Sequence, residues 1–385
     1  MRQTIEELRR LQSQPLEKKI LMTRQRIREW VTHYGEDKVY VSFSGGKDST
    51  VLLDIARKDY PNMSAVFVDT GLEYPEIRDF VKTYDNVVWL KPKLNFRQVI
   101  EKYGYPIISK EICENVCDAK RYLFQLLDEI PDADLTEIEN SEEFAELLNE
   151  RMVNKSGGSN QRLAIMLGML TRDKEHPIKP KDRNDNKSDY SMERYRFLLN
   201  APFRVSNKCC NVMKKNPSHK YADETGCRPI TGQMASESKL RERKWLQYGC
   251  NMFDIGYPIS NPMSFWLEND VLEYCKRYNI KICSIYGEIV EDIEKEGSID
   301  GQITMEDYGL METNHYWKVT GSDRTGCMFC LYGIHVQKSP NRLELLRDSH
   351  PKLYDYIMRP EEQGGLGYKE KIDWINEHGH MDIKY

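Results

Sequence analysis

The sequence predicts an α/β fold: a doubly wound parallel sheet with helical inserts and a helical C-terminal part. Short apolar runs at residues 38–43, 63–68 and 87–90 indicate buried strands. Segments in which apolar residues recur at helical spacing separate these runs, at about residues 50–59 and 74–84. Strands that alternate with helices are typical of a parallel sheet covered by helices on both faces.

Further elements are expected on either side of this core. Residues 15–34 form an amphipathic pattern that Gly35 stops, which predicts a helix before the first strand. Residues 96–127 predict further helix, and residues 229–234 predict another core strand. The same spacing rule predicts helices at 237–248 and 267–278, and a mainly helical tail at 341–385.

Composition narrows the class of protein. The net charge of −5 over 385 residues argues against a generally basic nucleic-acid binder, although a local basic groove remains compatible with it. The longest strongly apolar stretch, near residues 163–170, is far shorter than the ~20 residues that span a bilayer. The first residues lack the apolar run of a signal peptide, so we expect a cytoplasmic protein without a membrane partner. Ten cysteines are then expected as thiols or metal ligands.

A glycine-rich segment, SGGKDST, joins the first expected strand to its helix: Ser44, Gly45, Gly46, Lys47, Asp48, Ser49 and Thr50. Two glycines let the backbone turn sharply and approach an anion, and the following helix offers free N–H groups and its positive end. The lysine adds a charge for phosphate, and the hydroxyls add donors. The segment is not a Walker A loop, because Val41 stands where that motif needs glycine and Asp48 follows the lysine. It predicts a nucleotide-binding loop, with a plain Gly-Gly turn as the alternative.

Two further features suit a ligand site. Asp69 and Gly71 follow the second expected strand, and ligands bind at the carboxyl ends of strands in doubly wound sheets. A simple turn at the strand end is the alternative. Arg241 lies near the start of a predicted helix. This position is equally compatible with anion binding and with an ordinary surface arginine.

Four cysteines have spacing that suits a metal centre: Cys209, Cys210, Cys327 and Cys330. A Cys-x-x-Cys turn directs two thiolates to one metal or cluster. Adjacent cysteines diverge, which strains a single zinc site but lets them reach two corners of a cubane. Four thiolates suit either a [4Fe–4S] cluster or a structural zinc, and spacing alone does not decide between them.

The hexapeptide SGGKDS between a strand and a helix resembles the signature of the PP-loop, or adenine nucleotide alpha-hydrolase-like, superfamily. Members of that superfamily hold ATP or an adenylyl sulfate, with the loop around the pyrophosphate or sulfate end. Within it, the order of motifs is similar to the cluster-bearing adenylyl-sulfate and phosphoadenylyl-sulfate (PAPS) reductase family. The similar segments are SGGKDS at 44–49, VFVDTGLEYPEIRDF at 66–80, the cysteine pair, TGQMASES at 231–238, ISNPMSFWLENDVLEYCKRYNI at 259–280 and RTGCMFCLYG at 324–333.

This resemblance has implications for the site. It implies that the four cysteines ligate a [4Fe–4S] cluster beside the nucleotide. It implies nucleotide-facing roles for a set of loop residues: Asp69, Gly71, Gly232, Ser236, Ser238 and Arg241. It places Lys214 and Lys215 next to the phosphosulfate or the cluster, with a solvated charged face as the alternative.

The resemblance also implies a domain organisation. We expect an N-terminal helix at 1–35, a PP-loop nucleotide-binding domain at 36–335 and a helical tail at 336–385. Inserts near 131–200 and 288–318 interrupt the domain.

One feature departs from the family pattern. The reductases attack sulfur with a cysteine in a C-terminal tail, and this chain has no cysteine after Cys330. A thiolate is the nucleophile that this chemistry needs. Either another cysteine attacks or the chain performs different chemistry, and no catalytic residue is assigned. The candidates for another attacking cysteine are Cys113, Cys117, Cys227 and Cys250.

Three functions therefore stay open. The first is thiol-dependent reduction of adenylyl sulfate or PAPS to sulfite, with a thioredoxin-like reductant. The second is an ATP pyrophosphatase that adenylates a nucleic acid for sulfur transfer, as in tRNA thiolation or DNA phosphorothioation, with Mg²⁺ near Asp48 and a cysteine desulfurase as partner. The third is a non-catalytic nucleotide- and metal-binding sensor. A homodimer is compatible with all three.

Overall fold

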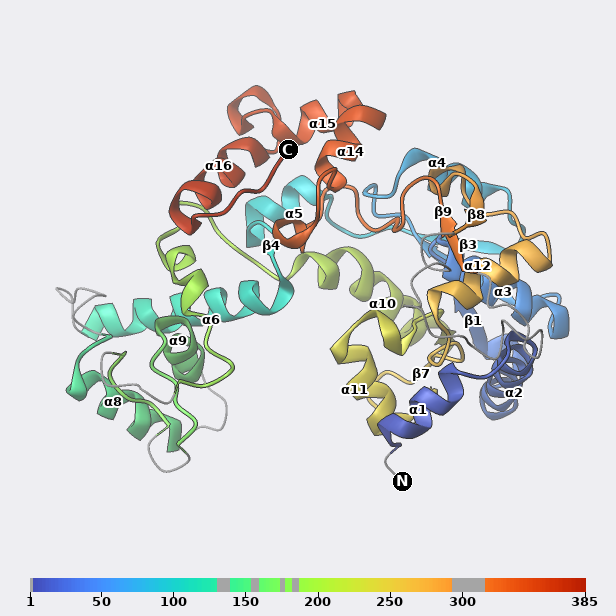
Figure 1. Cartoon of the computed structure of the whole chain (residues 1–385), viewed down its shortest axis with the longest axis horizontal. Helices are drawn as coiled ribbons and strands as arrows, with labels where there is room; N and C mark the ends of the chain where they lie inside the picture. The colour runs from blue at the N-terminus through green and yellow to red at the C-terminus, as the bar shows by residue number, and fades with distance from the viewer. Residues whose placement is uncertain (1–2, 130–138, 154–158, 174–176, 182–186, 293–315) are drawn as a thin grey trace, which may run out of the picture. The chain divides into compact units, whose positions relative to one another are not determined.

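The computed structural model describes residues 3–129, 139–153, 159–173, 177–181, 187–292 and 316–385 (Figure 1). The chain divides into two compact units, each made from two separate segments. Met1–Lys93 and Met213–Cys327 form the first unit, and Leu94–Val212 and Met328–Tyr385 form the second. Most of the predicted insert near 288–318 lies outside the described residues, whereas most of the insert near 131–200 is described and belongs to the second unit. The predicted domain boundaries stay predictions. Among the described helices, none has the length and apolar character needed to cross a membrane.

The first unit contains a six-stranded sheet of order β3-β2-β1-β5-β7-β6. All neighbouring pairs are parallel except β6 with β7. The chain moves outward from β1 to β3 and then returns to build β5 on the other side of β1, which confirms the predicted doubly wound sheet. The strands are β1 (Val39–Ser42), β2 (Ser64–Val68), β3 (Val87–Leu90), β5 (Arg228–Ile230), β6 (Asn251–Met252) and β7 (Ile259–Ser260).

Helices cover both faces of this sheet. Successive side chains of a strand point to opposite sides, so each face presents side chains that pack against helices. Tyr40 of β1 packs with Val66 and Cys227, and its ring meets Tyr221 of α10 (Asn216–Thr225) edge-on. Val41 points to the opposite face and is fully buried. The helices packed together beside β1 are α2 (Leu16–Tyr34), α3 (Lys47–Asp59) and α12 (Glu268–Arg277) (Figure 1).

The other elements of the first unit surround the sheet. They are α1 (Ile5–Gln12), α4 (Pro75–Lys82), α11 (Lys239–Tyr248) and the hairpin β8 (Ile289–Glu291) with β9 (Trp317–Val319). A π-helical turn, Asn211–Lys215, lies at the point where the chain passes between the units.

The second unit is mostly helical. Within its described residues, β4 (Ile107–Ile108) pairs in parallel with β10 (Leu331–Tyr332). Its described helices are α5 (Phe96–Tyr103), α6 (Lys110–Glu129), α8 (Glu142–Val153), α9 (Ser159–Leu167), the 3₁₀ helix Glu193–Asn200, α14 (Arg342–Ser349), α15 (Pro351–Met358) and α16 (Tyr368–Gly379).

The predicted helical stretch at 96–127 forms two helices, because α5 ends at Tyr103 and α6 begins at Lys110. Gly104 follows α5 with φ +108°, a conformation that favours glycine. A Cβ on Gly104 would lie 2.5 Å from the backbone of Arg204, so a distant segment occupies the space that a side chain would need. Strand β4 then fills the gap between the two helices.

A buried ion pair joins α2 to α12. The Nζ atom of Lys19 lies 2.6 Å from Oδ2 of Asp270, and Lys19 is only 2% exposed. Asp270→Ala is expected to lower the free energy of unfolding by about 3–5 kcal/mol, because the lysine charge stays buried without its partner. Urea unfolding followed by circular dichroism measures the change.

A matched control uses the exposed pair Lys220–Glu224 of α10. Glu224→Ala is expected to change the free energy of unfolding by less than about 1 kcal/mol. Equal losses for the Asp270 and Glu224 variants would show that burial of the first pair contributes nothing.

Candidate nucleotide-binding site

The SGGKDST segment leaves the carboxyl end of β1 as predicted, and its two glycines lie in crowded positions. Gly45 has φ +72°, and a Cβ there would lie 2.8 Å from Val81 and 2.9 Å from Ile77 of α4. A Cβ on Gly46 would lie 3.2 Å from the hydroxyl of Tyr286. Any larger residue at either position would displace the turn and fill the space beside it.

Helix α3 begins at Lys47, so the second half of SGGKDST forms its first turn. The hydroxyls of Ser49 and Thr50 both donate to the carbonyl oxygen of Gly46, at 2.9 and 3.0 Å. The backbone N–H of Ser44 donates to Ser49 Oγ at 3.2 Å. These two hydroxyls, predicted as phosphate donors, thus hold the turn in shape.

Lys47 supplies the positive charge of the segment from a buried position, with the residue only 5% exposed. Its Nζ lies 3.0 Å from Oε1 of Glu268 and donates to the carbonyl oxygen of Asp323 at 2.9 Å. Burial lowers the pKa of Lys47, but the charges of Asp48 and Glu268 outweigh burial and leave that pKa raised. The ammonium group therefore stays protonated.

Asp48 has a carboxylate oxygen that lacks a protein partner. Its Oδ1 is buried and makes no hydrogen bond to any residue that the structure describes. Burial raises the pKa of Asp48, and the charge of Lys47 opposes that rise. A buried carboxylate oxygen without a donor fits a divalent cation, or a water bound to one, as its missing partner.

Asp48→Asn is expected to weaken ATP binding about tenfold in the presence of Mg²⁺ and to leave it unchanged or tighter in EDTA. The amide loses affinity for the cation but also removes a negative charge from beside the phosphates. Titration calorimetry with and without Mg²⁺ measures both affinities. An equal loss in the two conditions would contradict a cation-binding role.

The loop after β5 meets SGGKDST where the strand order reverses. A Cβ on Gly232 would lie 3.1 Å from the carbonyl oxygen of Asp48, so the two backbones approach closely. Arg241 forms an ion pair with Glu237. Burial lowers the pKa of Arg241, while the charge of Asp48 raises it and that of Arg324 lowers it. Gly232, Arg241 and Asp48 therefore share one neighbourhood, and their predicted contact with a nucleotide stays a prediction.

The two predicted serines of this loop have structural partners. Ser238 caps α11, since its Oγ accepts from the backbone N–H of Arg241 at 3.3 Å. Ser236 Oγ donates to the carbonyl oxygen of Trp266 at 3.4 Å. Their predicted contact with a nucleotide stays a prediction.

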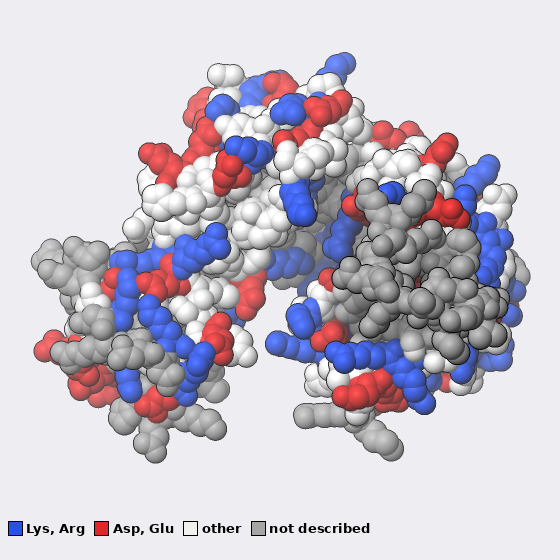
Figure 2. Space-filling model, in the orientation of Figure 1, with Lys and Arg blue, Asp and Glu red and all other residues white. Residues whose placement is uncertain are grey.

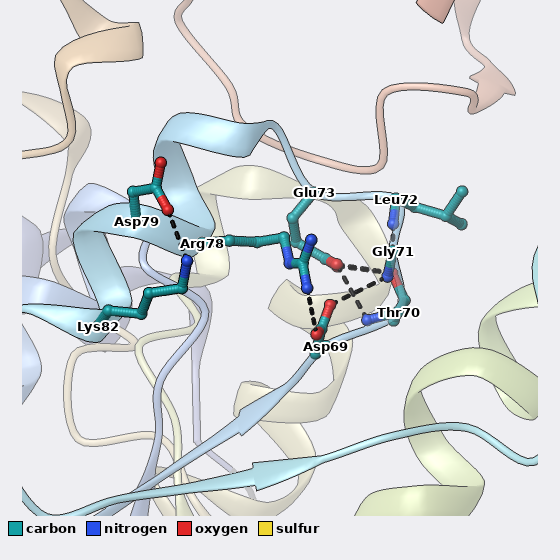
Figure 3. Close-up of polar contacts among 8 residues, drawn as sticks. All are labelled: Asp69, Thr70, Gly71, Leu72, Glu73, Arg78, Asp79 and Lys82. Atoms are coloured by element: carbon teal, nitrogen blue, oxygen red, sulfur yellow. Dashed lines mark hydrogen bonds and ion pairs between the residues drawn. The ribbon is translucent and has the colours of Figure 1, made fainter. Parts of the chain in front are cut away.

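The loop after β2 is ordered by Asp69 (Figure 3). Its Oδ2 lies 2.8 Å from the guanidinium of Arg78, and its Oδ1 accepts from the backbone N–H of Gly71 at 3.2 Å. Gly71 has φ +73°, which explains its residue type. Asp69 thus holds the turn and directs Arg78 across it.

A second buried carboxylate, Glu73, holds the same loop (Figure 3). It accepts from the backbone N–H and from the hydroxyl of Thr70, at 3.0 and 2.8 Å. The Nζ of Lys214 lies 3.7 Å from Glu73. One predicted anion-binding lysine is thereby linked to the carboxyl end of β2, whereas Lys215 lies in the same π-helical turn as Lys214.

Sequence reasoning missed several residues that surround SGGKDST. Glu73 and Arg78 lie within the segment at 66–80 that resembles the reductases. Their charges at that place could have marked them as candidate site residues. The remaining ones come from distant parts of the chain: Glu268, which lies within the reductase-like segment at 259–280, Tyr286 and Asp323.

The predicted metal ligands fall on both sides of the unit division. Cys327 is the last residue of the first unit, and the other three belong to the second. Burial raises the pKa of Tyr332, and the charges of Cys113, Cys210, Cys330 and Cys209 raise it further, so these thiols share its surroundings. Within the described ranges, no three His, Cys, Asp or Glu side chains are arranged to hold a metal ion.

The cysteines considered as alternative nucleophiles are mostly buried. Burial raises the pKa of Cys113 to about 12, and its thiol donates to the carbonyl oxygen of Ile107. Burial also raises the pKa of Cys117 and of Cys250. A raised pKa disfavours the thiolate, so these side chains are poor nucleophiles as they stand. Cys227 is buried beside the carbonyl oxygen of Asp37.

Comparison with known proteins identifies the family. The model of the phosphoadenosine phosphosulfate reductase domain matches residues 38–132 and 141–330. The chain belongs to the PAPS reductase family. It is 44% identical over 84 residues to the uncharacterized protein MJ0973 of Methanocaldococcus jannaschii, a match that covers 20% of each chain. The crystal structure of PAPS reductase from Candida auris in complex with phosphate is similar over 74% of this chain and 91% of that chain, with 13% identity and a TM-score of 0.33.

Proposed function

We propose that this PAPS reductase family member binds an adenine nucleotide at SGGKDST and cleaves one of two bonds. These are the S–O bond of adenylyl sulfate or PAPS, or the bond between the α and β phosphates of ATP. The observation that supports this most directly is the carboxyl end of β1. There, the strand order reverses, and two glycines in crowded positions lie beside a buried charged lysine and an unpartnered carboxylate oxygen. Doubly wound sheets bind ligands at this position.

The leading reaction is thiol-dependent reduction of adenylyl sulfate or PAPS. A thiolate attacks the sulfur, the S–O bond breaks, and AMP or its 3′-phosphate leaves with the bonding electrons. A second thiol then attacks the resulting S-sulfonate, so that sulfite leaves and a disulfide remains. The two electrons come from a dithiol such as a thioredoxin-like reductant. Lys47 and Arg241 would neutralise the charge that develops on the leaving phosphate.

A [4Fe–4S] cluster on Cys209, Cys210, Cys327 and Cys330 is part of this proposal, with zinc as the alternative. The donor chemistry fits, since four thiolates are the usual ligand set for such a cluster. Three of the four thiols surround Tyr332 in one unit. When bound, the cluster would supply charge near the substrate and would stabilise the structure.

A second candidate is cleavage of ATP between the α and β phosphates. One observation favours it: the unpartnered oxygen of Asp48 suits Mg²⁺. An oxygen of a nucleic acid would attack the α-phosphorus, and pyrophosphate would leave. The terminal sulfur of a persulfide made by a cysteine desulfurase would then displace AMP. A thiol reductant would cleave the resulting S–S bond, so that the thiolated product is released and a disulfide remains.

Anaerobically purified protein distinguishes these reactions. With adenylyl sulfate or PAPS and a dithiol, release of sulfite and AMP or its 3′-phosphate would support reduction. With Mg²⁺-ATP, pyrophosphate released only when DNA or tRNA is present would support the second candidate. Nucleotide binding without turnover in either assay would contradict both reactions and indicate a sensor.

A further inference from the structure

Helix α11 presents a face of exposed positive charges in the first unit. Lys239, Arg243 and Lys244 are exposed, whereas Trp245 faces the interior and is 3% exposed. Figure 2 shows Lys and Arg side chains gathered over this part of the molecule. Leu240 lies on the same face and is 65% exposed. We call Lys239, Leu240, Arg243 and Lys244 the α11 basic face.

The charges of this face lack acidic partners within the described part of the chain. No ion pair joins Lys239, Arg243 or Lys244 to a described Asp or Glu, whereas Arg241 on the inner side of the helix pairs with Glu237. Lys239 and Arg243 are four residues apart, so like charges face each other along the helix, which is unfavourable in isolation. They also lie in the first turns of α11, where the helix dipole already repels cations. A bound polyanion would relieve both penalties.

The α11 basic face adjoins the candidate nucleotide site. Helix α11 starts directly after the loop that approaches Asp48, and Ser238 caps it. Arg241 extends from the helix into the neighbourhood of Asp48 and Arg324. A polymer lying along α11 would therefore reach the position where an adenylate would be activated.

We propose that the α11 basic face binds the phosphate backbone of a nucleic acid, which is the substrate in the second candidate function. Its three cations span six residues, or about 7.5 Å of helix. That length matches about two phosphates of one strand. Tyr248, 43% exposed near the end of the helix, offers a ring on which a base can stack. An acidic polypeptide is the competing partner and is separated by the experiment.

The test measures binding of fluorescein-labelled single-stranded DNA, single-stranded RNA and tRNA to the full chain by anisotropy across a range of salt concentrations. The variant Lys239→Glu/Arg243→Glu/Lys244→Glu is expected to bind at least about tenfold more weakly. For this variant, the slope of log affinity against log salt concentration is expected to be smaller in magnitude by about 2. The control variant Lys18→Glu/Arg28→Glu/Lys281→Glu changes the net charge equally at other exposed cations of the first unit. It is expected to bind like the wild type.

Three outcomes would overturn the proposal: no nucleic-acid binding by the wild type, equal losses in both variants, or labelled poly-glutamate bound as tightly and with the same dependence on α11. Calorimetry with ATP keeps this result separate from the proposed function. If ATP binds but nucleic acid does not, the proposal for the α11 basic face fails while the proposed nucleotide binding stands. If nucleic acid binds through α11 but no adenine nucleotide binds, the proposed function fails alone.

Discussion

Gly46→Val is expected to abolish adenine-nucleotide binding, with an affinity for ATP or adenylyl sulfate at least about a hundredfold weaker, or about 2.8 kcal/mol. Even a Cβ at this position would lie 3.2 Å from Ser44 Oγ and from the hydroxyl of Tyr286. The two methyl groups of valine would then occupy the space above the first turn of α3, where an anion would accept from backbone N–H groups. Titration calorimetry against each nucleotide measures the loss.

Gly256→Val is the matched control for this prediction. Gly256 lies in the same unit, and a Cβ there would meet no atom within 4 Å. Its affinity for nucleotide should equal that of the wild type. A folded Gly46→Val protein that still binds ATP normally would place the nucleotide elsewhere and remove the basis of both proposed reactions.

Cys330→Ser is expected to remove the metal centre. Anaerobically purified wild type should be brown and hold about four iron atoms per chain, whereas the variant should be nearly colourless and free of iron. The reason is that a serine hydroxyl is a far poorer ligand for iron than a thiolate. Iron and zinc analysis together with the visible absorbance spectrum measure the difference.

Cys227→Ser provides the corresponding control, because this buried cysteine lies in the first unit and has no ligand spacing. It should keep the full iron content. A colourless wild type with about one zinc per chain would replace the cluster by a structural zinc. A Cys330→Ser protein that retains all its iron would exclude this residue as a ligand.

The central sheet could be predicted because its strands are short apolar runs with a clear turn at each end. The predicted run at 87–90 coincides with β3, and those at 38–43 and 63–68 contain β1 and β2. The break between α5 and α6 could not be predicted, since it depends on the backbone of Arg204, a hundred residues away from Gly104. Local periodicity carries no information about such a contact.

The candidate site shows the same contrast between features that the sequence reveals and contacts that it does not. The glycines, Lys47 and Asp48 form one contiguous motif, so their chemistry was visible in the sequence. The partners of that motif were not visible, because Glu268 and Tyr286 lie far from it in the sequence and approach it only in the folded chain. Ser49, Thr50 and Ser238 show the converse: their residue type suits an anion, but the structure uses their hydroxyls to hold turns and a helix end.

The pairing of β4 with β10 brings Ile107 beside Leu331. During synthesis on the ribosome, the first half of the second unit therefore emerges long before the strand that completes it. The first unit also awaits its later segment, since β5 supplies the inner neighbour of β1. Neither unit can finish folding as the nascent chain leaves the exit tunnel, so both reach their native packing late and at nearly the same stage of translation. Exposed apolar surface of the early segments would make them clients of chaperones in that interval.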